Sequence, residues 1–421
     1  MTVVRSPKYV EPSVLAVKCI TLPYGSADPL LLEVDDDSLV ADCRGPEGVV
    51  DLEARQRVTA ALAATAEGPA LESHVVPGDH VVISLAGAVP QADAVVAAVI
   101  ERLVGAGIEA ADITLLIGPA VEPSARPMPA IVAGAGPGSV VEFDPAIEPQ
   151  TSFVATDSAG RPIHLARALV DADVVVNIGG WGWDAAGGGR SFEGELWPTF
   201  SRQECRQDLV RSLARRGRLA VDQWKLSNSE AIWQLGVCAN LRIVAGRGNT
   251  LTAAVFGLPD TASDQARAAA AGWRPRVGRP AMLTVASLSQ SDGGLLLLLR
   301  AVAAAARVTH PSGTLCVASR LTQRPGLIFS RWREGAPLDG LVREAIGTGD
   351  QALIADAFLT RFFASALGDR RLVLLSDLDE ATVEELEFGY AATPEVVERL
   401  AHRADSVAVL HEADRMLPRL V

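Results

Sequence analysis

The residues with the clearest potential for chemistry lie in one glycine-rich loop. The β-branched run at residues 174–176 predicts a buried strand, and the following residues 179–189 include six glycines. Glycine lets the backbone approach a ligand closely and leaves N–H groups open to an anion. Arg190 comes next, and its planar guanidinium suits a carboxylate or a phosphate. The pattern predicts a binding loop for a small anion, with a flexible surface turn as the alternative.

The other side chains of this loop limit what it could catalyse. It holds no Lys, His or Cys, so it offers no obvious nucleophile or metal ligand. Asp184 is its single acidic residue and a candidate acid or base, with capping of a turn as the alternative. Arg300, on a later predicted helix, is a further candidate, with a solvated arginine as the alternative. The predicted ligand-binding residues are Trp181, Trp183, Gly187, Gly188, Gly189, Arg190 and Arg300.

Metal sites and common nucleotide motifs are not expected. The five cysteines are scattered without a C-x-x-C pair, which is typical of free thiols in a reducing compartment. No histidine lies between His164 and His310, a span that includes the glycine-rich loop. The sequence contains neither a G-x-x-x-x-G-K-[ST] phosphate loop nor a G-x-S-x-G serine motif.

Alternating strands and helices must position this loop. Strands are predicted at residues 80–85, 112–117 and 174–178, with a helix at 92–105. This alternation indicates a mostly parallel sheet, and ligands bind such sheets at the carboxyl ends of the strands. The loops after Leu85, Ile117 and Ile178 are therefore expected to form the site. Further along, the pattern predicts a helix at 203–217 and a strand at 219–222.

A second α/β unit follows a short linker. Residues 271–280 contain two prolines, two glycines and three arginines, which favours a linker at about 273–280. This division gives an N-terminal α/β domain at 1–272 and a C-terminal α/β domain at 281–421. Strands at 281–286, 313–319, 371–376 and 406–411 alternate there with helices at 295–305 and 393–403. A polar glycine loop at 287–294 separates the first strand from the first helix.

Composition excludes several classes of partner. The chain has 421 residues, is 49% hydrophobic and carries a net charge of −13, which argues against nucleic acid and anionic membranes. No apolar run approaches the roughly 18 residues that a transmembrane helix needs. The N-terminus has no signal-peptide core, so a cytoplasmic location is expected.

Several short motifs occur along the chain in a definite order. This order resembles that of the nickel-pincer-dependent lactate racemases and their 2-hydroxy-acid racemase and epimerase relatives, and the resemblance covers nearly the whole chain. It implies two α/β domains with an interdomain cleft that the glycine-rich loop faces. The motifs are Leu22-Pro-Tyr-Gly25, Val81-Val-Ile-Ser84, residues 115–118, Ala172-Asp-Val-Val, Gly188-Gly-Arg190, Ser291-Asp-Gly-Gly294, Gly313-Thr-Leu-Cys-Val and Ser376-Asp-Leu378.

The chain departs from this family where the family does its chemistry. Members have Asp-His-Thr-Arg-Pro and Gly-Phe-His-Arg-Pro loops, whereas residues 85–90 and 118–123 read Leu-Ala-Gly-Ala-Val-Pro and Gly-Pro-Ala-Val-Glu-Pro. Ser191 stands where a lysine holds the pincer nucleotide, and Arg300 replaces a lysine of the second domain. The family's catalytic histidine has no counterpart between residues 178 and 190, and its nickel-ligating histidine has none at 205–210.

These losses bear on mechanism. The family's racemisation needs two bases on opposite faces of the substrate carbon and a hydride acceptor, the nickel-bound pincer. We therefore expect neither this cofactor nor standard racemisation. The prediction is a lactate-racemase-like protein, diverged or inactive, that binds a small anion, a 2-hydroxy acid or a nucleotide in the interdomain cleft, or serves as an accessory partner.

Two other hypotheses stay open. An active 2-hydroxy-acid racemase or epimerase, an isomerase, would use non-standard residues such as Asp184, Glu193 or Glu122. An unrelated α/β ligand-binding module would gain support if Trp181 and Trp183 filled the cleft. The sequence also leaves self-association open.

Overall fold

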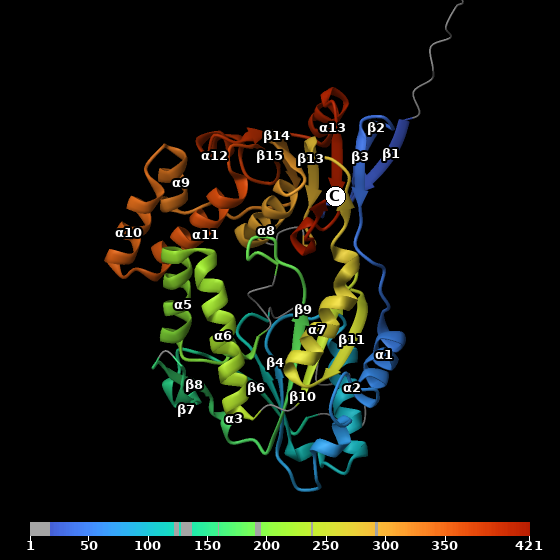
Figure 1. The fold of residues 1–421 in the computed structure, drawn as a ribbon, viewed down its shortest axis with the longest axis vertical. Coiled ribbons are helices and arrows are strands. Elements are labelled where there is room, and N and C mark those ends of the chain that lie inside the picture. Colours follow the sequence, from blue (N-terminus) through green and yellow to red (C-terminus); the bar gives the residue numbers. More distant parts are fainter. Residues whose placement is uncertain are drawn as a thin grey trace, which may run out of the picture.

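The chain forms two β-sheets that lie one after the other along the long axis of the molecule (Figure 1). The computed structural model describes residues 17–121, 126–127, 137–158, 160–189, 195–236, 239–290 and 294–421. These residues form two six-stranded sheets in which nearly all neighbouring strands are parallel. The predicted α/β class with mostly parallel sheets is confirmed.

The first sheet has the strand order β11-β10-β9-β4-β5-β6, and only the β10–β11 pair is antiparallel. β4 and β5 are buried along their whole length, as apolar β-branched strands covered on both faces should be. Ser84, Asn177 and Asn240 nevertheless lie inside, linked by side-chain hydrogen bonds. The strands are β4 (Val81–Leu85), β5 (Ile113–Ile117), β6 (Ser139–Glu142), β9 (Val174–Trp181), β10 (Ala239–Ala245) and β11 (Leu251–Gly257).

Helices and a hairpin cover both faces of this sheet. Helices α1 and α2 pack on one face, and the β7–β8 hairpin and α6 pack on the other. The strand predicted at 219–222 is wrong: those residues lie in α6, whose buried Ala220, Val221 and Trp224 follow helical spacing. The elements are α1 (Asp51–Ala63), α2 (Ala92–Gly105), β7 (Thr151–Thr156), β8 (Pro162–Ala166), α3 (Arg167–Val170), α4 (Leu196–Thr199), α5 (Gln203–Arg216), α6 (Arg218–Leu235) and α7 (Pro259–Ala269).

The second sheet has the order β16-β15-β14-β13-β17-β3 and is parallel throughout. Helices α8 and α11 cover one face, and α13 packs on the other. The strands are β13 (Ala281–Ser287), β14 (Thr309–Ala318), β15 (Arg371–Leu375), β16 (Gly389–Tyr390) and β17 (Val407–Leu410). The helices are α8 (Gly294–Ala306), α9 (Leu327–Arg333), α10 (Leu338–Thr348), α11 (Gln351–Leu367), α12 (Glu380–Glu385) and α13 (Pro394–Arg403).

The first described strands belong with the second sheet, although the predicted first domain includes them. β3 (Leu39–Cys43) pairs with β17 as its edge strand. The antiparallel hairpin of β1 (Val17–Leu22) and β2 (Leu30–Asp35) packs on the same sheet beside α13. The boundary predicted between residues 1–272 and 281–421 therefore does not follow sheet membership at the N-terminal side.

The predicted linker is not a free tether. Its β12 (Arg276–Val277) pairs in parallel with β18 (Arg419–Leu420) near the other end of the chain. Leu417 N also donates to Trp273 O. These contacts hold the connection between the two units close to the body of the protein.

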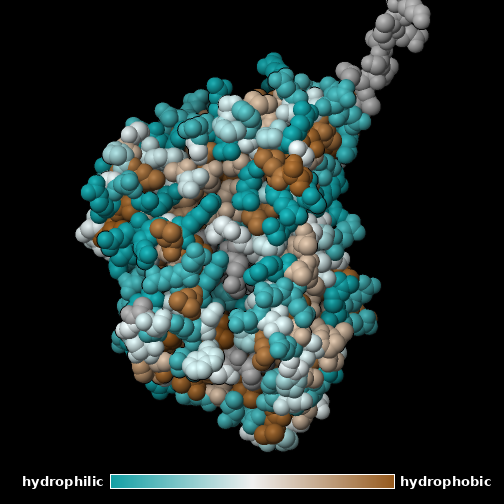
Figure 2. Space-filling model, viewed as in Figure 1, coloured by the Kyte–Doolittle hydropathy of each residue, from teal (hydrophilic) through white to brown (hydrophobic). Residues whose placement is uncertain are grey.

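Of the helices in the described ranges, none is long and apolar enough to span a membrane. On the face seen in Figure 2, hydrophobic side chains are dispersed in small groups among polar ones.

Candidate functional site between the two sheets

The glycine-rich loop begins where β9 ends, at the carboxyl edge of the first sheet. β9 pairs with both β4 and β10, so its end is a central position in the sheet. A Cβ placed on Gly180 would lie 3.7 Å from Ala88 O, so the loops after β4 and β9 are in contact. In Figure 1 the green segment after β9 extends towards α8 of the second unit. The loop therefore lies between the two sheets.

A buried ion pair ties this loop to the second unit. Arg300 Nε on α8 donates to Asp184 Oδ2 at 3.0 Å, and the two side chains are 9% and 1% exposed. Asp184 Oδ1 accepts a 3.0 Å bond from Gly187 N, and its carbonyl accepts one of 2.7 Å from Gly189 N. Added hydrogen bonds of this kind offset the cost of burying charge. Asp184 thus caps the turn, and Arg300 is a buried partner of the loop.

The two tryptophans pack inside the protein beside the loop. Trp181 and Trp183 are 6% and 8% exposed, and their rings meet edge to face with centroids 4.9 Å apart. Trp183 Nε1 donates to Ala270 O at 2.9 Å, and the Arg274 guanidinium lies 4.5 Å from the Trp183 ring centroid. Neither tryptophan is among the described residues that line the cleft. The two tryptophans therefore support the glycine-rich loop from the interior of the protein.

Two residues of the glycine triplet adopt a backbone that favours glycine. Gly188 and Gly189 have φ values of +79° and +125°, at which residues with a side chain are strained. Gly187 and Gly189 are buried, and a Cβ on Gly189 would touch Leu417 at 3.4 Å. The remaining candidates Arg190, Ser191, Glu193 and Glu122 lie outside the described residues.

An open cleft of about 770 Å³ lies where the two units face each other. Residues 179–189 and Arg300 are not among its lining residues, and the loop approaches it through Gly180, whose added Cβ would lie 3.9 Å from Val89 of the lining. Helices α1 and α2 of the first unit both begin at it, and the second unit contributes the segment after β13. Helix N-termini carry partial positive charge and unpaired N–H groups, which favour anions. The polar residues that line the cleft are Asp51, Arg55, Gln91, Asp93, Arg126, Asn249, Ser289, Gln290 and Arg415.

Gln91 makes two side-chain hydrogen bonds to other residues that line the cleft. Its backbone has φ +55°, which is uncommon for a residue with a side chain. Gln91 Nε2 donates to Asn249 O at 2.6 Å, and its Oε1 accepts from Asp51 N at 2.7 Å. Three elements are joined in this way at the mouth of the cleft. Strained residues concentrate at functional sites, and nothing in the sequence around Gln91 signals the strain.

The arginines of the cleft are all engaged with neighbours. Arg55 Nε donates to Glu101 at 3.0 Å, and Arg126 Nη1 donates to Glu142 at 2.5 Å. Arg415 Nη1 donates to Glu412 and to the carbonyls of Gly246 and Gly248, each at 2.9 Å. The cleft is therefore polar but not strongly cationic. At the start of α1, the N–H groups of Asp51, Glu53 and Ala54 already have partners, so the start of α2 is the more suitable place for an anion.

Glu412 links the cleft to the turn between β10 and β11. Its Oε1 accepts from Gly248 N at 2.8 Å. Burial raises the pKa of Glu412 from its ordinary value of 4.5, and the nearby Arg415 only partly opposes this. This carboxyl is therefore a titratable contact between the two units.

One group of residues elsewhere has the composition of a metal site. Among the described residues, ligand atoms of Glu33, Glu398 and His402 lie within 4.8 Å of one another. They lie on β2 and α13, away from the cleft, and Glu33 and His402 are exposed. The residues lining the cleft itself include no His, Cys or Lys where they are described.

The fold is that of a two-unit α/β protein with a cleft at the carboxyl ends of its parallel strands. No protein-family model and no curated protein matches the chain. Its structure is similar to that of the lactate racemase apoprotein from Thermoanaerobacterium thermosaccharolyticum, with a TM-score of 0.71 and 14% identity over 96% of this chain and 100% of that one. A protein from Thermotoga maritima is similar at a TM-score of 0.61 and 12% identity, over 87% and 98%. These similarities show that the fold is lactate-racemase-like.

Proposed function

We propose that this chain is a lactate-racemase-like protein that binds a small anion in the cleft between its two units. The ligand class is a 2-hydroxy acid or a nucleotide phosphate. The observation that carries the proposal is the start of two long helices, α1 and α2, at one cleft of about 770 Å³. That volume lies in the range of small-molecule sites.

The side chains that line the cleft would orient a bound ligand through hydrogen bonds more than they would attract it by charge. The amides of Gln91, Asn249 and Gln290 can donate to ligand oxygens, while the three arginines keep their present partners. Ser289 is held by Asp414, to which its N donates at 2.6 Å and its Oγ at 2.5 Å. Asp184 and Arg300 tie the glycine-rich loop to the second unit, outside the described lining of the cleft.

The residues present do not fit the nickel-pincer nucleotide of the lactate racemases. That group needs a lysine for its covalent attachment and a histidine for nickel, a metal for which imidazole is a suitable ligand. The described lining offers carboxylates, amides, hydroxyls and arginines instead. Asp184, proposed from the sequence as an alternative base, has both carboxylate oxygens in hydrogen bonds. We therefore derive no racemisation step for this chain.

Calorimetric titration with lactate, gluconate and pyridine nucleotides tests the proposal. At least one of them should bind, and Arg190→Ala should weaken that binding by roughly 10- to 150-fold, as expected for loss of a charge-assisted hydrogen bond. Arg343→Ala on α10 is the matched control and should bind like the wild type. Failure of all these anions to bind would overturn the proposal, whereas unchanged binding by Arg190→Ala would assign the anion to the described residues that line the cleft.

A further inference from the structure

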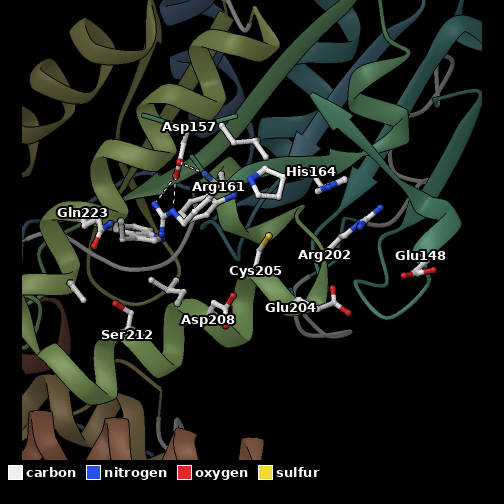
Figure 3. Close-up of a pocket in the computed structure, with 16 residues that line it drawn as sticks. Glu148, Asp157, Arg161, His164, Arg202, Glu204, Cys205, Asp208, Ser212 and Gln223 are labelled. Atoms are coloured by element: carbon white, nitrogen blue, oxygen red, sulfur yellow. Dashed lines mark hydrogen bonds and ion pairs between the residues drawn. The ribbon is translucent and has the colours of Figure 1, made fainter. Parts of the chain in front are cut away.

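A second cavity lies wholly within the first unit, apart from the cleft. It has a volume of about 460 Å³ and is enclosed by the β7–β8 hairpin, α4, α5 and α6. Figure 3 shows Cys205, Asp208 and Ser212 along α5, with His164 of β8 opposite Cys205. The function proposed above does not use any of these residues.

The walls of this pocket are apolar and aromatic. Trp197 and Trp224 contribute indole rings, and Ile163 and Leu209 add aliphatic surface. Trp197 and Trp224 are only 7% and 4% exposed, so a fixed framework holds them. Pockets that bind small organic molecules have this volume and this mainly apolar lining with a few polar groups.

Hydrogen bonds hold the walls open before any ligand arrives. Arg161 Nη2 on the hairpin donates to Ser227 Oγ on α6 at 2.6 Å, and Arg161 Nε donates to Asp157 at 2.8 Å. Trp197 N donates to the side chain of Asn228 at 3.1 Å. These bonds join the hairpin, α4 and α6, so the pocket is pre-formed and binding would need little reordering.

The charges around the pocket favour a cation. Arg161 is paired with Asp157, and Asp208 is paired with Arg211, which lies outside the lining, at 2.5 Å. The carboxylates of Glu148 and Glu204 then face the guanidinium of Arg202, so the lining keeps an excess of negative charge. The two acids on α5 lie one turn apart and face the same opening as Cys205 (Figure 3).

The buried groups of the pocket carry little net charge. Burial, with help from Arg202, lowers the pKa of His164, which favours its neutral imidazole at neutral pH. Burial and the neighbouring carboxylates of Asp208 and Glu204 raise the pKa of the Cys205 thiol, which favours its protonated form. The buried carboxylate of Asp157 is paired with Arg161, so an apolar ring would meet its charge already compensated.

From this arrangement we infer that the pocket binds a small aromatic amine. Its ring would lie among Trp197, Trp224 and Ile163, and its ammonium group would lie at the opening beside Glu204 and Asp208. Aromatic faces and carboxylates both attract such a cation. Neutral aromatic molecules should bind less tightly, and aromatic acids least tightly of all.

Three probes of nearly equal size test the inference on the full chain: 2-phenylethylamine, 2-phenylethanol and phenylacetate. Binding is followed by protection of Cys205 from alkylation, measured by peptide mass spectrometry, with the exposed Cys19 as an internal control. At a concentration ten times its dissociation constant, the amine should slow modification of Cys205 about tenfold and leave Cys19 unchanged. No protection by any probe, or equal affinity for phenylacetate and the amine, would overturn the inference.

A charge variant separates recognition of the amine from simple filling of the pocket. In Glu204→Gln/Asp208→Asn, the affinity for 2-phenylethylamine measured by calorimetry should fall roughly three- to tenfold, while that for 2-phenylethanol should not change. Asp222→Asn on α6, which removes an exposed carboxylate outside the pocket, is the matched control. Unchanged affinity for the amine in the double variant would overturn the assigned role of the acids.

Discussion

The two cavities of this protein are built in different ways. The cleft lies between two sheets, and its shape depends on contacts that cross from one unit to the other, such as Asp184–Arg300 and Gly248–Glu412. The second cavity, called the side pocket from here on, lies within the first unit. Hydrogen bonds among the β7–β8 hairpin, α4 and α6 hold its walls in place. The cleft should therefore respond to changes in contacts across the units, and the side pocket should not.

We expect the largest effect from loss of the buried ion pair between Asp184 and Arg300. Arg300→Ala leaves the carboxylate of Asp184, 1% exposed, without its guanidinium partner. We expect the free energy of unfolding to fall by about 3–5 kcal/mol, as for a buried pair with one member removed. Denaturant titration measures this loss.

The same variant should separate the two cavities. The exposed Arg343→Ala on α10 serves as the control and should cost less than about 0.5 kcal/mol. Below the unfolding transition, Arg300→Ala should weaken anion binding in the cleft and leave binding of 2-phenylethylamine unchanged. A loss of stability below about 1 kcal/mol would show that the ion pair does not hold the units together.

Backbone strain in the glycine triplet gives the next largest effect. Gly189→Ala places a Cβ at φ +125° and 3.4 Å from Leu417, which we expect to cost about 1–3 kcal/mol of stability. Gly182→Ala in the same loop is a matched control, because a Cβ there meets no atom within 4 Å and its φ is not positive. If the two variants had equal thermal stability, the requirement for glycine at position 189 would be contradicted.

Removal of the Gln91 side chain should have a moderate effect that is limited to the cleft. Gln91→Ala loses the bonds to Asn249 O and Asp51 N, at a cost of about 1 kcal/mol each before relaxation. Calorimetry should show weaker anion binding, because α1, α2 and the β10–β11 turn are no longer joined. If Gln91→Ala instead weakens 2-phenylethylamine binding, the two cavities are not independent.

The smallest effect concerns pH. Burial raises the pKa of Glu412 in the folded protein, so the folded state favours the protonated carboxyl more than the unfolded state does. The wild type should therefore lose stability as the pH rises from about 4.5 through this raised pKa, and Glu412→Gln should remove that loss. Denaturant titrations between pH 4 and pH 8 compare the two. A larger pH dependence in the variant would contradict this sign.

The periodicity of the sequence predicted most strands of both sheets, because apolar β-branched runs such as residues 81–85 and 113–117 are buried on both faces. It did not predict that β3 joins the second sheet, since pairing between residues 39–43 and 407–410 is a long-range event without a local signal. The predicted strand at 219–222 failed because Leu219, Ala220 and Val221 suit either state locally, and only packing around Trp224 selects a helix.

The site was only partly predictable for the same reason. Glycines at positions 187–189 are a local signal, and they do form a turn with left-handed backbone. The pairing of Asp184 with Arg300 joins residues more than a hundred positions apart, and Gln91 acts through a backbone conformation that its type does not suggest. The aromatic side pocket also escaped prediction, because its walls come from four elements with no common motif.

The central claim is that the chain has a lactate-racemase-like fold whose cleft binds an anion without the nickel-pincer nucleotide. Co-expression with the enzymes that make this cofactor, followed by intact-mass and nickel analysis of the purified protein, tests it most directly. We predict the unmodified mass and no stoichiometric nickel. A covalent nucleotide adduct with bound nickel would contradict the account and support an active 2-hydroxy-acid racemase or epimerase.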